Sequence, residues 1–198
     1  MKNRTFGIAA LGVAAAFVLA LAGCSDSNSM EGMDHGGGSS ESSASSAVAS
    51  TADVEFVSMM IPHHEQAVEM SDILLAKDGI DERVTRLAQQ IKDAQAPEIA
   101  MMQQWLTDWD PEPMTSMEGM DHGGMMSVDD LDDLTAAEGT DAGRLFLEQM
   151  MEHHRGAVEM AQTQIDAGQN ADAVALAETI VDTQSQEITE MENLLQVL

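Results

Sequence analysis

Two histidine doublets, each bracketed by methionines, are the residues whose types could do chemistry here. The segment MIPHHEQAVEM (residues 60–70) returns as MMEHHRGAVEM (residues 150–160), with every matched position ninety residues later. Thioether sulfur together with imidazole nitrogen suits a soft or borderline ion such as copper. If both segments are helical, the methionines and the first histidine of each copy share one face: Met60, His63 and Met70, and then Met150, His153 and Met160.

The position one helical turn before each doublet argues against a hard metal ion. Helical bundles that hold two iron ions supply Glu-x-x-His, with a carboxylate at this place. Here Met60 and Met150 occupy it. Replacing oxygen by thioether sulfur lowers the affinity for iron(II) or manganese and favours Cu(I), with Cu(II) as the second oxidation state. The sequence leaves open whether the two faces share one site or form two equivalent sites.

Adjacent histidines on a helix point about 100° apart, so one doublet cannot bind an ion symmetrically through both rings. We therefore expect His63 and His153 to be the central ligands. His64 and His154 remain candidate ligands, but we expect them nearer the surface or in supporting positions.

A second set of polar residues and methionines is repeated further along each half, at helical spacing. Polar groups inside an apolar stripe need partners, and these could hydrogen-bond the imidazoles and fix their tautomers. A purely structural hydrogen bond between helices is the alternative. The methionines of the set are candidate ligands. The set consists of Gln95, Glu98 and Met102, and of Gln184, Glu187 and Met191.

A third pattern, SMEGMDHGG, occurs at residues 29–37 and again, identically, at residues 116–124. These glycine-rich stretches show no apolar period, so their methionines have no core to fill. Two thioethers and an imidazole can close around one copper ion. We expect weaker and more exchangeable binding here than in a packed site, through Met30, Met33 and His35 and through Met117, Met120 and His122.

The first residues resemble a secretory leader. Lys2 and Arg4 precede an apolar run at residues 6–22, and the run ends in Leu-Ala-Gly-Cys. This ending resembles a bacterial lipobox, which would make Cys24, the only cysteine of the sequence, the lipid-modified first residue. A plain signal peptide or an uncleaved anchor is the alternative. We expect a signal peptide at residues 1–23, a flexible Ser/Gly-rich tether at 24–50 and a folded domain at 51–198 with a linker at 110–139.

The charge of the chain excludes one class of partner. After Cys24 it keeps six of the eight basic residues and all 35 acidic ones. Such a chain repels nucleic acid, which needs a basic footprint, but it raises the local concentration of cations.

Apolar periodicity and capping residues predict four long helices. The first begins near residues 51–53 and runs to about Lys77, with a bend at Pro62. The second follows Asp81, is interrupted at Pro97 and ends near Trp109. A short helix is predicted around residues 128–134. The third long helix, capped by Thr140 or Asp141, ends at Gly168, and the fourth follows Asn170.

The second helix of each half also repeats, so the repeated unit is a helical hairpin. Neither hairpin can bury its apolar stripe alone. The sequence therefore predicts an all-α fold, a four-helix bundle built from two repeated hairpins.

The doublet segments and the Gln-x-x-Glu-Ile helices resemble the domain-of-unknown-function family 305, over about residues 53–198. The resemblance implies a ferritin-like four-helix bundle, export from the bacterial cell, and copper binding through the methionines and histidines named above. The second copy departs from the first in having Arg155-Gly156 where the first has Glu65-Gln66, so the two halves need not be equal.

These observations predict a lipid-anchored, extracytoplasmic copper-binding protein that sequesters or passes on copper, without catalysis. Copper ions, the membrane, and other copper-handling envelope proteins are the expected partners, and nucleic acid is not. A metal-dependent oxidase with a ferritin-like fold and an envelope interaction module without metal are the competing hypotheses.

Overall fold

Helices make up nearly all of the part of the chain that the structure describes. The structure is a computed structural model, and it describes residues 49–111 and 123–198. Within these residues four helices are long and one is short. They are α1 (Thr51–Leu75), α2 (Glu82–Trp109), α3 (Val128–Ala136), α4 (Gly139–Ala167) and α5 (Ala171–Leu195).

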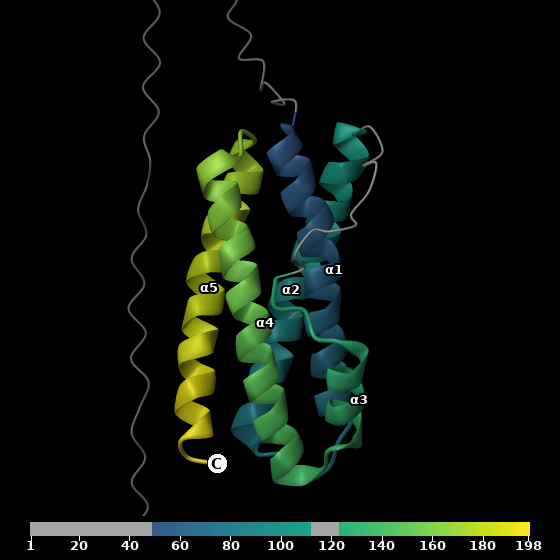
Figure 1. The fold of residues 1–198 in the computed structure, drawn as a ribbon, viewed down its shortest axis with the longest axis vertical. Coiled ribbons are helices and arrows are strands. Elements are labelled where there is room, and N and C mark those ends of the chain that lie inside the picture. The colour runs from purple at the N-terminus through teal and green to yellow at the C-terminus, as the bar shows by residue number, and fades with distance from the viewer. Residues whose placement is uncertain (1–48, 112–122) are drawn as a thin grey trace, which may run out of the picture. The chain divides into compact units, whose positions relative to one another are not determined.

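The four long helices form a bundle, as predicted. In Figure 1, α1 runs antiparallel to α2, and α4 runs antiparallel to α5. Helix α2 ends at the end of the bundle where α1 begins, whereas α4 begins at the opposite end, so the chain joins two helix ends at opposite ends of the bundle. One long crossover between two hairpins is the topology of ferritin-like bundles. The predicted all-α, ferritin-like architecture is therefore confirmed.

The core consists of two clusters, and the ninety-residue repeat maps residues of one cluster onto residues of the other. One contains Ala67, Phe146 and Met150, and the other contains their repeat counterparts Ala157, Phe56 and Met60. Each long helix contributes to both clusters. A repeat that maps each cluster onto the other implies a pseudo-two-fold axis between them, and the two doublets lie at that level of the bundle.

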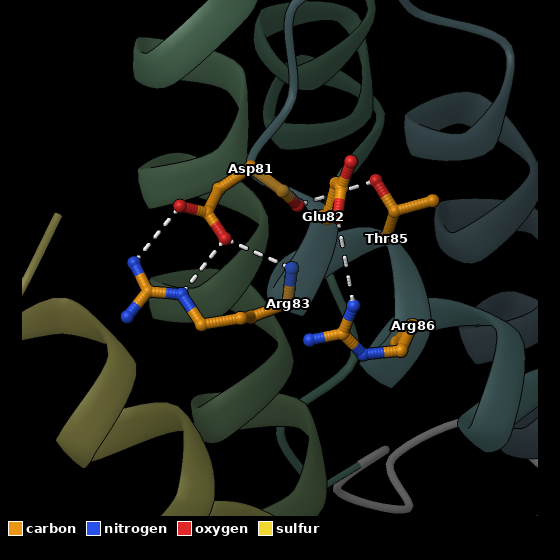
Figure 2. A network of polar contacts seen from close by, with 5 residues as sticks. All are labelled: Asp81, Glu82, Arg83, Thr85 and Arg86. Carbon is orange, nitrogen blue, oxygen red and sulfur yellow. Dashed lines mark hydrogen bonds and ion pairs between the residues drawn. The ribbon is translucent and has the colours of Figure 1, made fainter. Parts of the chain in front are cut away.

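The start of α2 illustrates how local chemistry fixes the helix ends. Asp81 accepts from the backbone N–H of Arg83 at 2.8 Å, and the guanidinium of Arg83 donates to both oxygens of the same carboxylate (Figure 2). These hydrogen bonds lower the pKa of Asp81 to about 2. The hydroxyl of Thr85 donates to the Asp81 carbonyl, and Arg86 pairs with Glu82 one turn on. The predicted cap at Asp81 is thus confirmed.

A buried carboxylate holds the two hairpins together at one end of the bundle. Asp53 is fully buried and forms a capping box with Ser50 at the start of α1. Its oxygens also accept from Gln164 Nε2 at 2.6 Å and from the backbone N–H groups of Gln169 and Asn170 at 3.1 Å. Burial alone would raise the pKa of Asp53, but the hydrogen bonds from Ser50, Gln164 and the backbone keep it below its usual value.

Two predicted details are wrong. Helix α4 begins at Gly139 with Glu138 at its N-cap and no side-chain capping bond, so Thr140 and Asp141 lie in its first turn instead of capping it. Helix α2 continues through Pro97 to Trp109, because a proline removes one backbone hydrogen bond but the helix packs along its length on α1. Helix α1 continues through Pro62, which was predicted to lie inside it.

The bundle helices are amphipathic. Across residues 49–111 and 123–198, none of the helices combines the length and the apolar character that crossing a membrane requires.

Two capping boxes of the same type allow the role of Asp53 to be tested. We expect Asp53→Asn to lower the free energy of unfolding by about 2 to 3 kcal/mol, because a buried carboxylate then loses its charge-assisted hydrogen bonds. Asp130→Asn, in the more exposed Ser127–Asp130 box of α3, should cost about 1 kcal/mol or less. Urea unfolding followed by circular dichroism measures both. Equal losses would show that Asp53 does no more than cap α1.

Candidate metal site

All four doublet histidines are buried. His63 is 1% exposed, and His64, His153 and His154 are fully buried. Of the two placements expected for His64 and His154, the one nearer the surface is therefore wrong, and the supporting position stays a prediction. The reason is the packing of the two central helices: α1 contacts both α2 and α4, and α4 contacts both α1 and α5, so both directions in which a doublet points are covered.

His63 and His153 meet directly across the contact between α1 and α4. Their ring centroids are 3.7 Å apart, with the ring planes tilted by 40°. The two residues are counterparts in the repeat, and counterparts that touch each other must lie on the axis that relates the repeats. Of the two arrangements that the sequence left open, the structure therefore favours one shared centre over two separate sites.

The hydrogen bonds of this pair leave ring nitrogens without partners. His63 Nε2 lies 2.9 Å from the carbonyl oxygen of Gly123, and because a carbonyl can only accept, Nε2 carries the hydrogen. In the neutral ring the lone pair then sits on Nδ1, which has no hydrogen-bond partner among the described residues. Neither ring nitrogen of His153 reaches a partner within that same part of the chain.

The outer histidine of each doublet is oriented by a carboxylate. His64 Nε2 lies 2.8 Å from Glu98 on α2, and His154 Nε2 lies 2.8 Å from Glu187 on α5. Each Nδ1 again lacks a partner among residues 49–111 and 123–198. A carboxylate that accepts from one ring nitrogen fixes the tautomer and directs the other lone pair, as it does around bound metals.

The glutamines of the same helices do not reach the histidines. Gln95 and Gln184 are each 3% exposed. Within the described chain, both polar atoms of the Gln95 amide and the amide oxygen of Gln184 lack hydrogen-bond partners. The structure thus joins the two glutamates to the imidazoles and leaves the two glutamines beside them as buried polar groups.

The candidate methionine ligands belong to the two core clusters. Met60 and Met102 lie in one cluster, and Met70, Met150 and Met191 lie in the other, all fully buried. Met160 is half-buried at the edge of the first of these clusters. Met60 and Met150 each sit one helical turn before a histidine of the axis pair, on the same helix face.

The described residues around the axis pair offer few of the charged side chains that usually hold hard metal ions. Within residues 49–111 and 123–198, no three His, Cys, Asp or Glu side chains are grouped so as to hold a metal ion. Met60 and Met150, one helical turn before the axis histidines, are the sulfur donors of the same helix faces. The unpartnered nitrogens and neighbouring thioethers fit a soft ion that accepts few ligands.

Several predicted residues lie outside the described part of the chain. They are Cys24, the tether residues Met30, Met33 and His35, and the linker residues Met117, Met120 and His122.

The sequence reasoning missed how the linker is fastened over this pair. A Cβ atom at Gly156 would lie 1.7 Å from the carbonyl oxygen of Gly123, so only glycine permits the contact. On the other side the Gln66 amide donates to the carbonyl of Met126 at 2.9 Å and accepts from its N–H at 2.7 Å. Gln66 and Gly156 are counterparts in the repeat, and the difference between them was the one sequence feature that could have indicated this contact.

Burial determines the charge state of the axis pair. Desolvation, aided by the nearby imidazoles of His64 and His154 and opposed by the hydrogen bond with Gly123, lowers the pKa of His63 to about 3. Desolvation, followed by the charge of His63, sets the pKa of His153 well below its usual value. Both rings are thus neutral near pH 7, which is the form of histidine that binds metal ions.

The close packing of Gly156 predicts a large effect of a small substitution. We expect Gly156→Ala to lower the free energy of unfolding by about 1 to 3 kcal/mol and to displace the linker, because the new methyl group meets backbone atoms. Gly143→Ala on the same helix is the control, since its Cβ meets only a side-chain atom at 3.8 Å. That variant should be neutral or stabilised by up to about 1 kcal/mol. Urea unfolding and the amide shift of Gly123 measure both effects, and similar behaviour of the two variants would contradict the packing argument.

The lowered pKa of His63 predicts a pH dependence of stability. The unfolded chain binds a proton at His63 below about pH 6.5 whereas the folded chain does not, so stability is full above that pH and is lost on acidification toward about 3. At pH 5 the loss from this residue is about 2 kcal/mol.

The measurement is urea unfolding of the metal-free protein between about pH 7 and pH 5. His63→Gln is the matched variant, because its amide can still donate to Gly123 but does not titrate. We expect a flatter pH dependence by the stated amount. The same slope in both proteins would show that His63 is not buried as a neutral ring.

Comparisons with known proteins agree with this geometry. The family model described as "Domain of unknown function (DUF305)" matches residues 53–195. A Streptomyces coelicolor protein whose name describes it as a secreted DUF305 protein shares 37% identity over 73% of this chain and 91% of its own, with a TM-score of 0.68. A DUF305 fragment from Deinococcus radiodurans shares 33% identity over 76% of this chain and 99% of its own, with a TM-score of 0.67.

A third solved relative carries metal. CopM in its Cu(II)-bound form shares 32% identity over 73% of this chain and 95% of its own, with a TM-score of 0.62. CopM has also been solved in a Cu(I)-bound form, which is 32% identical with a TM-score of 0.60. Among curated proteins, none matches the chain. The family match over most of the described residues, together with the shared fold, establishes that this chain belongs to the DUF305 family.

Proposed function

We propose that this protein is a copper-binding protein outside the cytoplasm that sequesters copper or passes it on. The observation that carries the proposal is the buried pair of imidazoles, His63 and His153, in contact on the axis with ring nitrogens unpartnered among the described residues. The similarity to CopM, solved with Cu(I) and with Cu(II), supports copper as the ion.

The donors around this pair favour Cu(I). The ion would be held by nitrogen of His63 and His153 and by thioether sulfur of Met60 or Met150, with Met102 and Met191 in the same core clusters. Soft, uncharged ligands suit a monovalent soft ion, which loses less hydration on burial than a divalent one. Neutral rings are ready to bind without first releasing a proton.

The outer histidines extend the centre. Glu98 and Glu187 orient His64 and His154, and the negative charge of the two carboxylates compensates the charge of a bound cation nearby. This arrangement stores or hands over an ion and needs no reaction step, so we propose no enzymatic activity.

The location follows from the leader and from a relative. The apolar run before Cys24 and the lipobox-like ending support export and lipid attachment, and the Streptomyces relative is described as secreted. In this proposal Cys24 anchors the bundle, and the methionine- and histidine-containing tether and linker capture copper from the surroundings.

The test is an anaerobic Cu(I) titration against a chelator of known affinity. It uses the chain from Ser25 onward, which retains every residue of both core clusters. The axis-pair variant carries His63→Gln and His153→Gln. We expect binding in the tight class to weaken by about a hundredfold or more, because two nitrogen ligands are lost and even the loss of a supporting partner typically costs about 10- to 100-fold.

A matched variant replaces the methionines and histidines of the two SMEGMDHGG segments with serine. It should keep the tight class and lose only weaker binding. Circular dichroism checks that all proteins stay helical. If the axis-pair variant binds as tightly as the parent chain, the proposed centre is wrong, and if the parent chain binds no copper, so is the proposed function.

A further inference from the structure

Among the described residues, α3 covers the groove between α1 and α4 in one half of the bundle, and no helix covers it in the other half. At the covered half α3 packs against both helices, with Leu134 fully buried and the Gln149 amide donating to the Asp130 carbonyl at 2.8 Å. At the other half a cavity of about 280 Å³ lies between the same two helices. The pseudo-two-fold axis relates the halves, so this cavity occupies the place that α3 fills on the other side.

The cavity is lined by groups that bind soft cations. Met59 and Met160 present thioether sulfur, and both are half-buried. Glu55 and Glu159 line the same cavity and add two carboxylates, each one turn or one residue from a methionine. These four residues come from α1 and α4, so the site spans the two hairpins.

Two of these four residues are particular to this half of the bundle, because Met59 and Glu55 have different residues as repeat counterparts, whereas Glu159 and Met160 correspond to Glu69 and Met70. The counterpart of Met59 is Gln149, which is bound to α3, and the counterpart of Glu55 is Leu145, which packs on a core cluster. The counterpart of Met160 is Met70, which is fully buried. Met59 and Glu55 therefore line a cavity in the half of the groove where α3 does not pack, and Glu69, the counterpart of Glu159, is exposed in the other half.

The cavity also adjoins the histidine pair. Gly123, whose carbonyl accepts from His63, lines it together with Gly156. The cavity and the histidine pair therefore share Gly123 as a neighbour.

We infer that this cavity is a capture site for a monovalent soft metal cation, from which the ion passes to His63 and His153. The two sulfurs supply ligands of the required softness, and the two carboxylates supply a charge that attracts the cation in a partly hydrated setting. The choice of ion rests on the proposed function, whereas the site rests on the cavity and its lining.

The experiment is a titration with Ag(I), a monovalent soft ion that does not change oxidation state under these conditions. It follows the ¹³C-labelled methyl signals of methionine in the chain from Ser25 onward. The signals of Met59 and Met160 should shift together as one ion binds. Met101 on α2, which is 39% exposed and does not line the cavity, serves as the internal control and should shift far less.

Two variants separate this inference from the proposed function. With His63→Gln and His153→Gln, the shifts of Met59 and Met160 should persist. With Met59→Leu and Met160→Leu, which preserve side-chain volume, one bound ion per chain should be lost while the ring signals of His63 still respond. If Met59 and Met160 shift no more than Met101, the capture site does not exist, whether or not the histidines bind.

Discussion

The contact of two imidazoles on an internal two-fold axis constrains most of this structure. Polar rings at the centre of a bundle divide the apolar core into two clusters, one on each side. Because His63 and His153 are buried, they must stay neutral, and their neighbours His64 and His154 need the carboxylates of α2 and α5 for orientation. The central helices therefore carry the chemistry, and the outer helices supply the partners that make its burial tolerable.

The departures from symmetry are as informative as the symmetry itself. Gln66 binds the backbone of Met126, whereas its counterpart Gly156 admits the backbone of Gly123. The linker can pass over the axis pair only because one side offers an amide and the other offers no side chain. The same linker leads into α3, which covers one half of the central groove, and within the described residues a cavity lies in the other half.

Much of the fold could be predicted from the sequence, because helical periodicity, the cap at Asp81 and the hairpin repeat are local signals. The position of the histidines was harder. Periodicity identifies the face on which His64 lies but not which helix covers that face, so its burial against Glu98 was missed. The role of Asp53 in joining the hairpins was also missed, since its partners in the other hairpin, Gln164, Gln169 and Asn170, are more than a hundred residues away. The glycine at position 156, where the first copy has Gln66, was visible in the sequence. Its role in admitting the backbone of Gly123 could be recognised only once the position of the linker was known.

The crossover linker joins in one chain two hairpins that could otherwise associate as separate molecules. Two identical hairpins could associate through the same self-complementary contact as a homodimer. Joined in one chain, they meet at an effective concentration that no longer depends on how much protein is present, typically about millimolar for flexible connections. Fusion also frees the halves from identity: a homodimer must place the same residue at both related positions, whereas this chain has Gln66 at one and Gly156 at the other. The single chain can therefore give the histidine centre two different sides, one next to a cavity and one covered by α3.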